Sequence, residues 1–385
     1  MDHHELRGGS AVVGVGLAGC GAAPGRTAME LIGESAWNAV TDAGLKMRDI
    51  DAVFGVSAVH GMPSVTISEY LGIKPRYSDG SMIGGSSVVA HMLMATMAIR
   101  AGQCSTALIV YGSNQKSASG RLVSSTAEFN PYEQPYKPRF PITAYALAAS
   151  RHMHQYGTTR RQLAEVAVAA RGWANLNPEA FMHGPMTIDD VLNARMVCDP
   201  FGLLDCCLVT DGAGALVVVA RERAKDFPKK PVYFLGGAMA HWHRSIMQMP
   251  DLTVSAAAES GPRAFAMAGM EPADMDVLEL YDAFTINTIL FLEDLGFCPK
   301  GEGGRFVEGG RIAPGGSLPV NTNGGGLSCV HPGMYGAFIL VEAVRQLRGE
   351  AGDRQVKDAE TAIVHGNGGV LSSQVTTILG TEATL

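Results

Sequence analysis

A weak internal repeat limits the possible folds of this chain more than any other feature. Its two copies are DAGLKMRDIDAVFGV, at 42–56, and MAGMEPADMDVLELY, at 267–281. In each copy a helix-like stretch ends near Ala-Gly, and an Asp-Ile-Asp or Asp-Met-Asp motif precedes an apolar, strand-like stretch. Two copies of one helix–strand unit within 385 residues predict two stacked halves of similar α/β structure.

Strand-like and helix-like stretches alternate on both sides of the repeat. This rhythm predicts a parallel or mixed sheet covered by helices in each half. Residues 115–200 depart from it, because they are richer in Pro, Tyr, Arg and Asn and hold a helix pair, ITAYALAASRHMHQYG and RRQLAEVAVAARGWANL. We therefore expect a first half at 1–227 with an insertion at about 115–200, and a second half at 228–385.

Composition excludes several classes of function. The chain carries a net charge of −7 with no basic run, so nucleic acid is not an expected partner. No apolar run reaches the roughly 18 residues of a membrane helix, and the N-terminus lacks the pattern of a signal peptide. Seven cysteines without a framework spacing or a C-x-x-C pair predict reduced thiols in a cytoplasmic protein without a metal site.

Four short stretches lie at predicted strand ends, where α/β enzymes keep their chemistry. They are MIGGSSVVAH (82–91), LYDAFT (280–285), SCVHPGMYG (328–336) and VHGNGGVLSS (364–373). Glycines in three of them let backbone N–H groups approach a ligand oxygen. These stretches are the candidates for a catalytic or binding site.

The stretch NTNGGGLSCVHPGMYG, at 321–336, allows two interpretations: a loop that cradles phosphate, or one that carries a catalytic histidine. His331 precedes a proline and could polarise a carbonyl or move a proton. A lone histidine is more often structural, but His365 in a second glycine-rich turn favours catalysis. Tyr281 and Asp282 end a strand, and this tyrosine could equally be bonded only to backbone.

Three candidate nucleophiles, Ser86, Ser87 and Cys329, lie in the same stretches. Ser86 and Ser87 precede a helix, and one of them is expected to be its N-cap. Cys329 lies two residues before His331, but nothing in the sequence indicates that its pKa is lowered. The sequence alone therefore does not select a nucleophile.

With these stretches placed, the chain resembles the thiolase superfamily over nearly its whole length. The resemblance is greatest to sterol-carrier-protein-type thiolases and to thiolase-like aldolases of steroid side-chain breakdown. It rests on DAGLKMRDIDAV, AIRAGQCSTALIVYGS, LLDCCLVTDGAGALVV, LYDAFTINTILFLEDLGFCPKGE, NTNGGGLSCVHPGMYGAFILVEAVRQLRG and VHGNGG. It implies a five-layer αβαβα fold made of two similar halves, with a loop domain inserted in the first.

The resemblance also implies roles for individual residues. His331 would lie against the thioester carbonyl, and His365 would be a second acid–base group, as in the sterol-carrier type. Tyr281-Asp282-Ala283-Phe284 corresponds to the Asn-Glu-Ala-Phe motif of ordinary thiolases. Coenzyme A would enter as part of the substrate, with no permanently bound cofactor.

The binding site for the thioester and its partners follows from the same resemblance. We expect Gly85, Ser86, Ser87, Asn367 and Gly368 to bind the CoA thioester. The CoA phosphates would meet the insertion, which carries Arg139, Arg151, Arg160 and Arg161. A homodimer is expected, together with a small OB-fold protein with a zinc ribbon that binds the acyl-CoA and completes a heterotetramer.

One departure from the thiolase pattern decides between reactions. Counting back from Gly102 places the nucleophilic cysteine of thiolases at Gly85, and no cysteine is near. The first hypothesis is therefore retro-aldol cleavage of a β-hydroxyacyl-CoA, with Tyr281 as the acid–base residue. The alternatives are a β-ketoacyl-CoA thiolase or acyltransferase that uses Cys329 or a serine, and a non-catalytic subunit that binds acyl-CoA or lipid.

Overall fold

The computed structural model describes residues 6–118 and 131–385, and the stretch 119–130 of the predicted insertion lies outside them. The first half contributes five strands and three helices to the layers: β1 Ser10–Gly21, α1 Ala28–Asp42, β2 Ala52–Val56, α2 Pro63–Leu71, β3 Tyr77–Asp79, α3 Ser87–Arg100, β4 Thr106–Ser113 and β7 Asp211–Ala220. The second half contributes β8 Val232–His241, α8 Ala257–Ala268, β9 Val277–Leu280, α9 Thr285–Asp294, α10 Gly303–Phe306, α11 Gly336–Arg348, β10 Thr361–Gly368 and β11 Ser373–Gly380.

The strands run in the order β3-β2-β4-β7-β1-β8-β11-β10-β9. β1 and β8 pair over two positions, Ala11 with Tyr233 and Val12 with Val232, so the order divides into five strands from the first half and four from the second. Both groups are mixed, since β2 runs parallel to β3 and β4, and β9 runs parallel to β10. The predicted mixed sheet in each half is confirmed.

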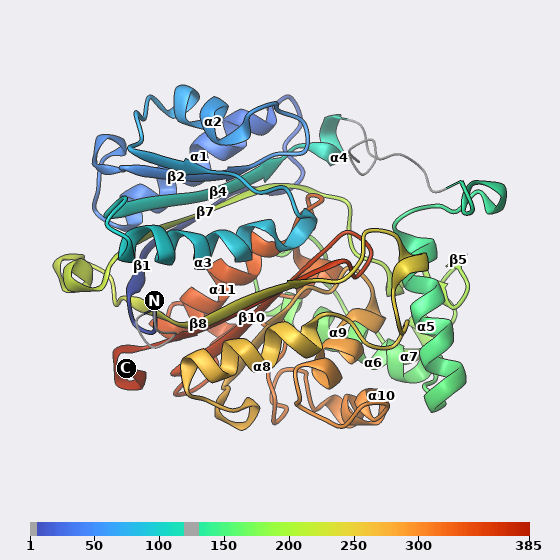
Figure 1. The fold of residues 1–385 in the computed structure, drawn as a ribbon. Coiled ribbons are helices and arrows are strands. Elements are labelled where there is room, and N and C mark those ends of the chain that lie inside the picture. The colour runs from blue at the N-terminus through green and yellow to red at the C-terminus, as the bar shows by residue number, and fades with distance from the viewer. Residues whose placement is uncertain (1–5, 119–130) are drawn as a thin grey trace.

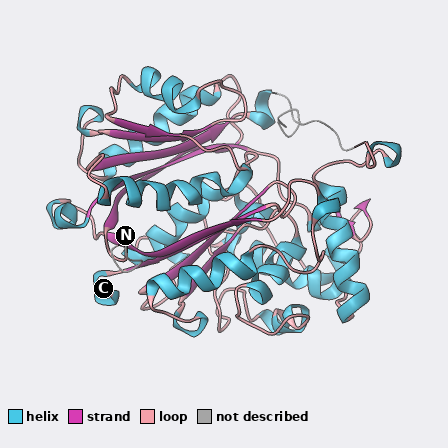
Figure 2. Ribbon diagram, in the orientation of Figure 1, coloured by secondary structure: helices cyan, strands magenta, loops and turns pink. Residues whose placement is uncertain are grey.

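Helices form three layers around these two groups of strands (Figure 1). α1 covers the outer face of the first group, α8 covers the outer face of the second, and α3 and α11 lie between the two groups. The middle position explains the sequence of α3, SVVAHMLMATMAIR, because a helix enclosed on both sides is apolar around most of its circumference. The five-layer αβαβα arrangement expected from the resemblance is confirmed (Figure 2).

The sequence repeat has the same structural function in both halves. The carboxylate of Asp51, just before β2, accepts hydrogen bonds from the N–H groups of Ser105 and Thr106 at the start of β4. The carboxylate of Asp276, just before β9, accepts from the N–H groups of Glu360 and Thr361 at the start of β10. The second aspartate of each copy therefore joins two neighbouring parallel strands.

The insertion between β4 and β7 lies against the second half. It holds α4 Gln115–Ala118, α5 Ile142–Tyr156, α6 Arg160–Asn175, α7 Ile188–Leu192, β5 Met196–Cys198 and β6 Phe201–Gly202. α5 and α6 both pack on α9, and α6 also packs on the turn 325–329. The predicted helix pair is present, and Tyr145 of α5 packs on Phe284, three residues after Tyr281, with ring centroids 4.7 Å apart. The division at residue 227 stays a prediction.

Candidate active site

Tyr281 and His331 meet at the centre of the molecule. The Tyr281 hydroxyl lies 3.1 Å from Nε2 of His331, and the two rings are perpendicular with centroids 5.6 Å apart. Tyr281 directly follows β9, and His331 lies in the extended segment before Pro332. The structure therefore joins two of the four predicted stretches through one hydrogen bond.

The backbone around His331 fixes its position. The His331 N–H donates to Oγ1 of Thr210 (2.9 Å), and the His331 carbonyl accepts from the side chain of Gln115 (3.2 Å). Nδ1 of His331 has no hydrogen-bond partner among the described residues. Burial lowers the pKa of His331 to about 4, so the ring is neutral at physiological pH.

The Tyr281 hydroxyl has two further backbone neighbours. The N–H of Tyr335 donates to it over 3.2 Å, and the Gly333 carbonyl lies 3.5 Å away. Burial raises the pKa of Tyr281 well above its ordinary value, so the phenol keeps its proton in the resting protein. The Tyr335 N–H would stabilise negative charge that develops on this oxygen during proton transfer.

Gly85, at the position expected for a thiolase nucleophile, lies directly against Tyr281. A Cβ atom at residue 85 would lie 2.5 Å from Cζ of Tyr281 and would overlap its hydroxyl. No side chain fits there unless Tyr281 moves. The ring of Tyr281 thus occupies the space into which a cysteine at position 85 would project.

The two serines after Gly85 are engaged in hydrogen bonds of their own turn. Oγ of Ser86 donates to the Ile83 carbonyl (3.0 Å) and lies 2.7 Å from Oγ of Ser373. Oγ of Ser87 donates to the Gly84 carbonyl (2.7 Å) and accepts from the Ile83 N–H (3.0 Å). Ser86 is the N-cap residue of α3, as predicted, but its side chain makes no capping hydrogen bond to the helix. Neither hydroxyl has a basic partner in these contacts.

Asp282 holds the turn that precedes His331. Its carboxylate accepts from the N–H groups of Gly326 (2.6 Å) and Leu327 (3.4 Å), in the short π-helical turn Gly325–Cys329. Burial raises the pKa of Asp282 to about 7, against the effect of these donors. Its contacts are those of a residue that positions the His331 loop.

The structure does not bring His365 to this cluster. His365 lies inside β10, so the predicted turn at this residue is wrong. Leu280 pairs with His365 in the parallel register, so the next residue, Tyr281, points to the opposite face. Nδ1 of His365 lies 2.9 Å from Oγ1 of Thr376, and Nε2 lies 2.9 Å from Oε1 of Gln374. These bonds occupy both ring nitrogens.

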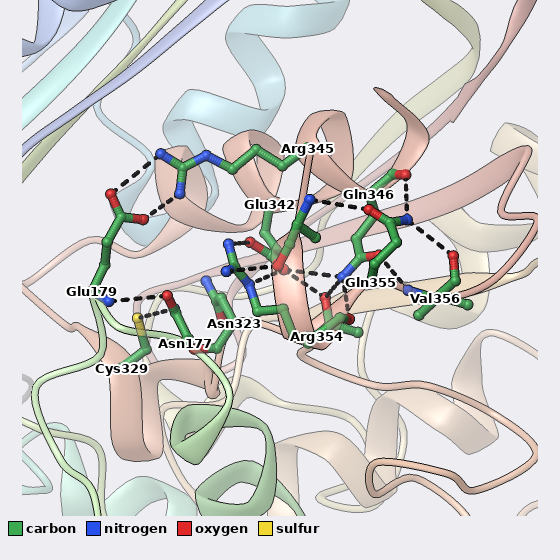
Figure 3. Close-up of polar contacts among 12 residues, drawn as sticks. Asn177, Glu179, Asn323, Cys329, Glu342, Arg345, Gln346, Arg354, Gln355 and Val356 are labelled. Carbon is green, nitrogen blue, oxygen red and sulfur yellow. Dashed lines mark hydrogen bonds and ion pairs between the residues drawn. The ribbon is translucent and has the colours of Figure 1, made fainter. Parts of the chain in front are cut away.

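Cys329 is also turned away from the Tyr281–His331 pair. Figure 3 shows its sulfur beside Asn177, near the ion pair of Glu179 and Arg345. The Asn177 side chain donates to the sulfur over 3.6 Å. Burial raises the pKa of Cys329 well above its ordinary value, which keeps it a thiol.

The predicted thioester-binding loops pack closely on one another. A Cβ atom at Gly84 would lie 2.7 Å from the Gly369 nitrogen, and one at Gly366 would lie 2.9 Å from Cγ2 of Val89. The two loops can approach this closely only because Gly84 and Gly366 have no side chain. The contact places the backbone of 366–369, which includes Asn367 and Gly368, against the turn that carries Gly85. The side chain of Asn367 faces elsewhere and donates to the Tyr145 hydroxyl.

The four arginines of the insertion differ in their surroundings. Arg160 lies 3.4 Å from the carboxylate of Asp205 and donates to the carbonyl of Leu192. The side chains of Arg139, Arg151 and Arg161 are exposed. In the described part of the chain, no three His, Cys, Asp or Glu side chains gather as metal ligands would.

Sequence reasoning missed several residues around the pair. Tyr335, within the quoted GMYG motif, packs edge-on against Tyr281 with centroids 5.7 Å apart, and its hydroxyl donates to Oδ1 of Asn323 over 2.6 Å. Tyr145 and Asn287 were missed as well, because nothing within the quoted stretches of α5 and α9 distinguishes them from the residues around them. The thiolase-like spacing of the glycine motifs carried no information about these helices.

Comparisons with known proteins agree with this fold and site. The thiolase C-terminal domain-like family matches residues 238–381. An acetyl-CoA acetyltransferase of Methanothermobacter thermautotrophicus is 35% identical, over 93% of this chain and 96% of its own. A steroid side-chain-cleaving aldolase of Thermomonospora curvata is 32% identical, over 98% of this chain and 99% of its own. A solved structure described as an Ltp2-ChsH2(DUF35) aldolase superposes with a TM-score of 0.90 at 31% identity, covering 98% and 99% of the two chains.

The chain belongs to the thiolase superfamily, in the group that includes thiolases and steroid side-chain-cleaving aldolases. The expectation drawn from its motifs is confirmed. Within the described residues, no helix has the length and apolar character needed to span a bilayer.

Proposed function

We propose that this protein cleaves a β-hydroxyacyl-CoA by a retro-aldol reaction. One observation carries the proposal: the Tyr281 ring fills the space beside Gly85, and its hydroxyl reaches His331. An acid–base residue thus stands where the resemblance to thiolases places a nucleophile. The relatives named as aldolases, which align over nearly the whole chain, support the same reaction.

The two side chains divide the proton chemistry between them. The substrate's β-hydroxyl proton passes to the Tyr281 oxygen as the proton of Tyr281 moves to Nε2 of His331. The β-carbon becomes the carbonyl carbon of a ketone or aldehyde, and the Cα–Cβ bond breaks. Its electron pair forms the enolate of the shorter acyl-CoA. The α-carbon then takes up one proton from the Tyr281–His331 pair, and the proton on Nε2 of His331 returns to Tyr281, which restores both residues.

His331 suits the thioester end of this reaction as well. A neutral ring that accepts at Nε2 carries its hydrogen on Nδ1, which has no partner among the described residues. That N–H would donate to the thioester carbonyl and stabilise the enolate oxygen. The backbone of 365–369, packed on Gly84, would assist. Asp282 would hold the His331 loop in place.

A β-ketoacyl-CoA thiolase is the second candidate, favoured by the similarity to the acetyl-CoA acetyltransferase. Its nucleophile would be Cys329, Ser86 or Ser87. The buried thiol with its raised pKa and the two engaged hydroxyls weigh against this reaction. A non-catalytic acyl-CoA-binding subunit would not need the hydrogen bond between Tyr281 and His331.

A substrate assay separates these functions. We expect cleavage of β-hydroxyacyl-CoA without free CoA, giving a ketone or aldehyde and a shorter acyl-CoA. Cleavage of β-ketoacyl-CoA that requires free CoA would support the thiolase. A His331→Ala variant that folds and turns over at the parent's rate would contradict both catalytic proposals.

We also propose that the chain works in the cytoplasm as a homodimer with a small OB-fold, zinc-ribbon partner. β3 is an edge strand of the described sheet and could pair with a second copy. The description of the Ltp2-ChsH2(DUF35) aldolase joins two components, which supports a partner subunit here. Full activity of the purified chain without a partner would argue against that subunit, and light scattering would test the dimer.

A further inference from the structure

Asn287 is a buried amide in the helix that follows the Tyr281 motif. It lies in the first turn of α9, directly after the Tyr281-Asp282-Ala283-Phe284 motif, and its exposed fraction is 0%. Neither Oδ1 nor Nδ2 of its side chain makes a hydrogen bond to the described residues. Buried amides are rarely left unpaired, because an unsatisfied polar group destabilises the folded state.

The Asn287 side chain lies beside the hydroxyl of Tyr145, where it partly opposes the effect of burial on the Tyr145 pKa. That hydroxyl is already engaged: it accepts from Nδ2 of Asn367 (2.7 Å) and donates to the Gly369 carbonyl (3.0 Å). The Tyr145 ring packs on Phe284 with centroids 4.7 Å apart. Tyr145 therefore borders the region of Asn287 without donating a hydrogen bond to it.

Cys207 connects this region with the catalytic tyrosine. Its N–H donates to the Ala283 carbonyl over 2.9 Å, and its thiol contributes to the raised pKa of both Tyr145 and Tyr281. Cys207 itself is half-buried. The Gly369 carbonyl that accepts from Tyr145 belongs to the loop packed on Gly84, and the neighbouring Gly85 lies against Tyr281, so Tyr145 and Asn287 border the same site as the catalytic tyrosine.

We propose that Asn287 hydrogen-bonds the β-oxygen of the acyl group and selects oxygenated acyl-CoAs over unsubstituted ones. The inference rests on the proposed retro-aldol function, whose substrate must carry this oxygen. A carboxamide offers both a donor and an acceptor, so a hydroxyl group can satisfy both of its polar atoms, whereas an alkyl chain satisfies neither. Binding of an unsubstituted acyl group leaves the amide unpaired and is therefore weaker.

Binding in a protein that cannot turn over isolates this contact. In a Tyr281→Phe background we expect β-hydroxyacyl-CoA to bind about 10- to 100-fold more tightly than the saturated acyl-CoA of equal length. Adding Asn287→Leu should abolish this preference while leaving the affinity for the saturated compound unchanged. The matched control is Thr377→Val, which removes a buried hydroxyl that also has no hydrogen-bond partner among the described residues, and this variant should keep the preference.

Two results would overturn the inference. A preference for the β-hydroxy compound that survives Asn287→Leu would show that the amide does not bind the oxygen. A lower melting temperature of ligand-free Asn287→Leu would show that the amide stabilises the protein itself, whereas we expect an unchanged or higher one. The cleavage assay on the parent protein tests the proposed reaction separately. If the parent cleaves β-hydroxyacyl-CoA but the binding preference survives Asn287→Leu, only the role of Asn287 is refuted. If the parent does not cleave it but Asn287→Leu abolishes the preference, only the proposed reaction is refuted.

Discussion

His331 and His365 are alike in burial and differ in what surrounds them. Burial lowers the pKa of each to about 4, so both rings are neutral. Nε2 of His331 is hydrogen-bonded to the Tyr281 hydroxyl, and its Nδ1 has no partner among the described residues. Both ring nitrogens of His365, in contrast, contact side chains of the neighbouring strand β11. A shifted pKa therefore does not distinguish the proposed catalytic histidine, His331, from His365, but the set of hydrogen-bond partners does.

The largest expected effect comes from removing the Tyr281 hydroxyl, which is hydrogen-bonded to His331. Tyr281→Phe should lower turnover of β-hydroxyacyl-CoA by about 10²- to 10⁴-fold, because the proton relay is lost while the ring still fills the space beside Gly85. Steady-state kinetics measure this. Tyr233→Phe, in the part of β8 that pairs with β1, is the control and should act like the parent.

The two histidines should respond oppositely to the same substitution. His331→Gln should lower turnover about 100-fold with little change in stability, since the ring shares one hydrogen bond. His365→Gln should lower the free energy of unfolding by about 1–3 kcal/mol, because Thr376 or Gln374 loses its partner, and should leave turnover within a few-fold. Kinetics and urea unfolding on both variants check this; the reverse pattern would exchange the two roles.

The contact between Gly85 and Tyr281 predicts a coupled pair of substitutions. Gly85→Ala should lower the free energy of unfolding by about 1–3 kcal/mol, because its Cβ atom would overlap the tyrosine ring. In a Tyr281→Ala background the same change should cost much less, so the two effects should not add. Urea unfolding of the four proteins gives the coupling. Additive effects would mean that the ring does not fill this space.

The smallest effect concerns the burial that the two histidines share. The pKa of a histidine is near 6.5 in the unfolded chain, whereas burial lowers the pKa of these two to about 4 in the folded protein. The unfolded chain therefore binds more protons between these two values, and the free energy of unfolding decreases as the pH falls from 6.5 towards 4. Replacing either one by Gln should reduce the loss between pH 7.5 and pH 5 by about 1–2 kcal/mol. Urea unfolding at the two pH values measures it. An unchanged loss would mean that the histidine is not buried as a neutral ring.

The sequence predicts the fold well because its repeat reports local structure. The Ala-Gly and Asp-x-Asp elements mark a helix end and a strand start in each half, and both aspartates bond the neighbouring strand. α9 has no such marker: TINTILFLED is buried along its whole length, so it shows no periodicity that separates one face from another.

The sequence predicts only part of the candidate site, because the face to which a strand residue points depends on its exact position in the strand. The motifs that carry Tyr281 and His331 lie together in the structure, as predicted. His365 was assigned to the same site because its motif suggested a turn, but β10 continues through Gly368. In a strand, neighbouring residues point to opposite faces, so extending the strand by a few residues decides which histidine faces Tyr281.

Intact-protein mass spectrometry during turnover, with products analysed in parallel, tests the central claim most directly. The protein would be mixed with β-hydroxyacyl-CoA and with β-ketoacyl-CoA. We expect no covalent adduct, together with a ketone or aldehyde and a shorter acyl-CoA released from the hydroxy compound. An acyl adduct on Cys329, Ser86 or Ser87 would show a thiolase with a relocated nucleophile and would contradict the role of Tyr281.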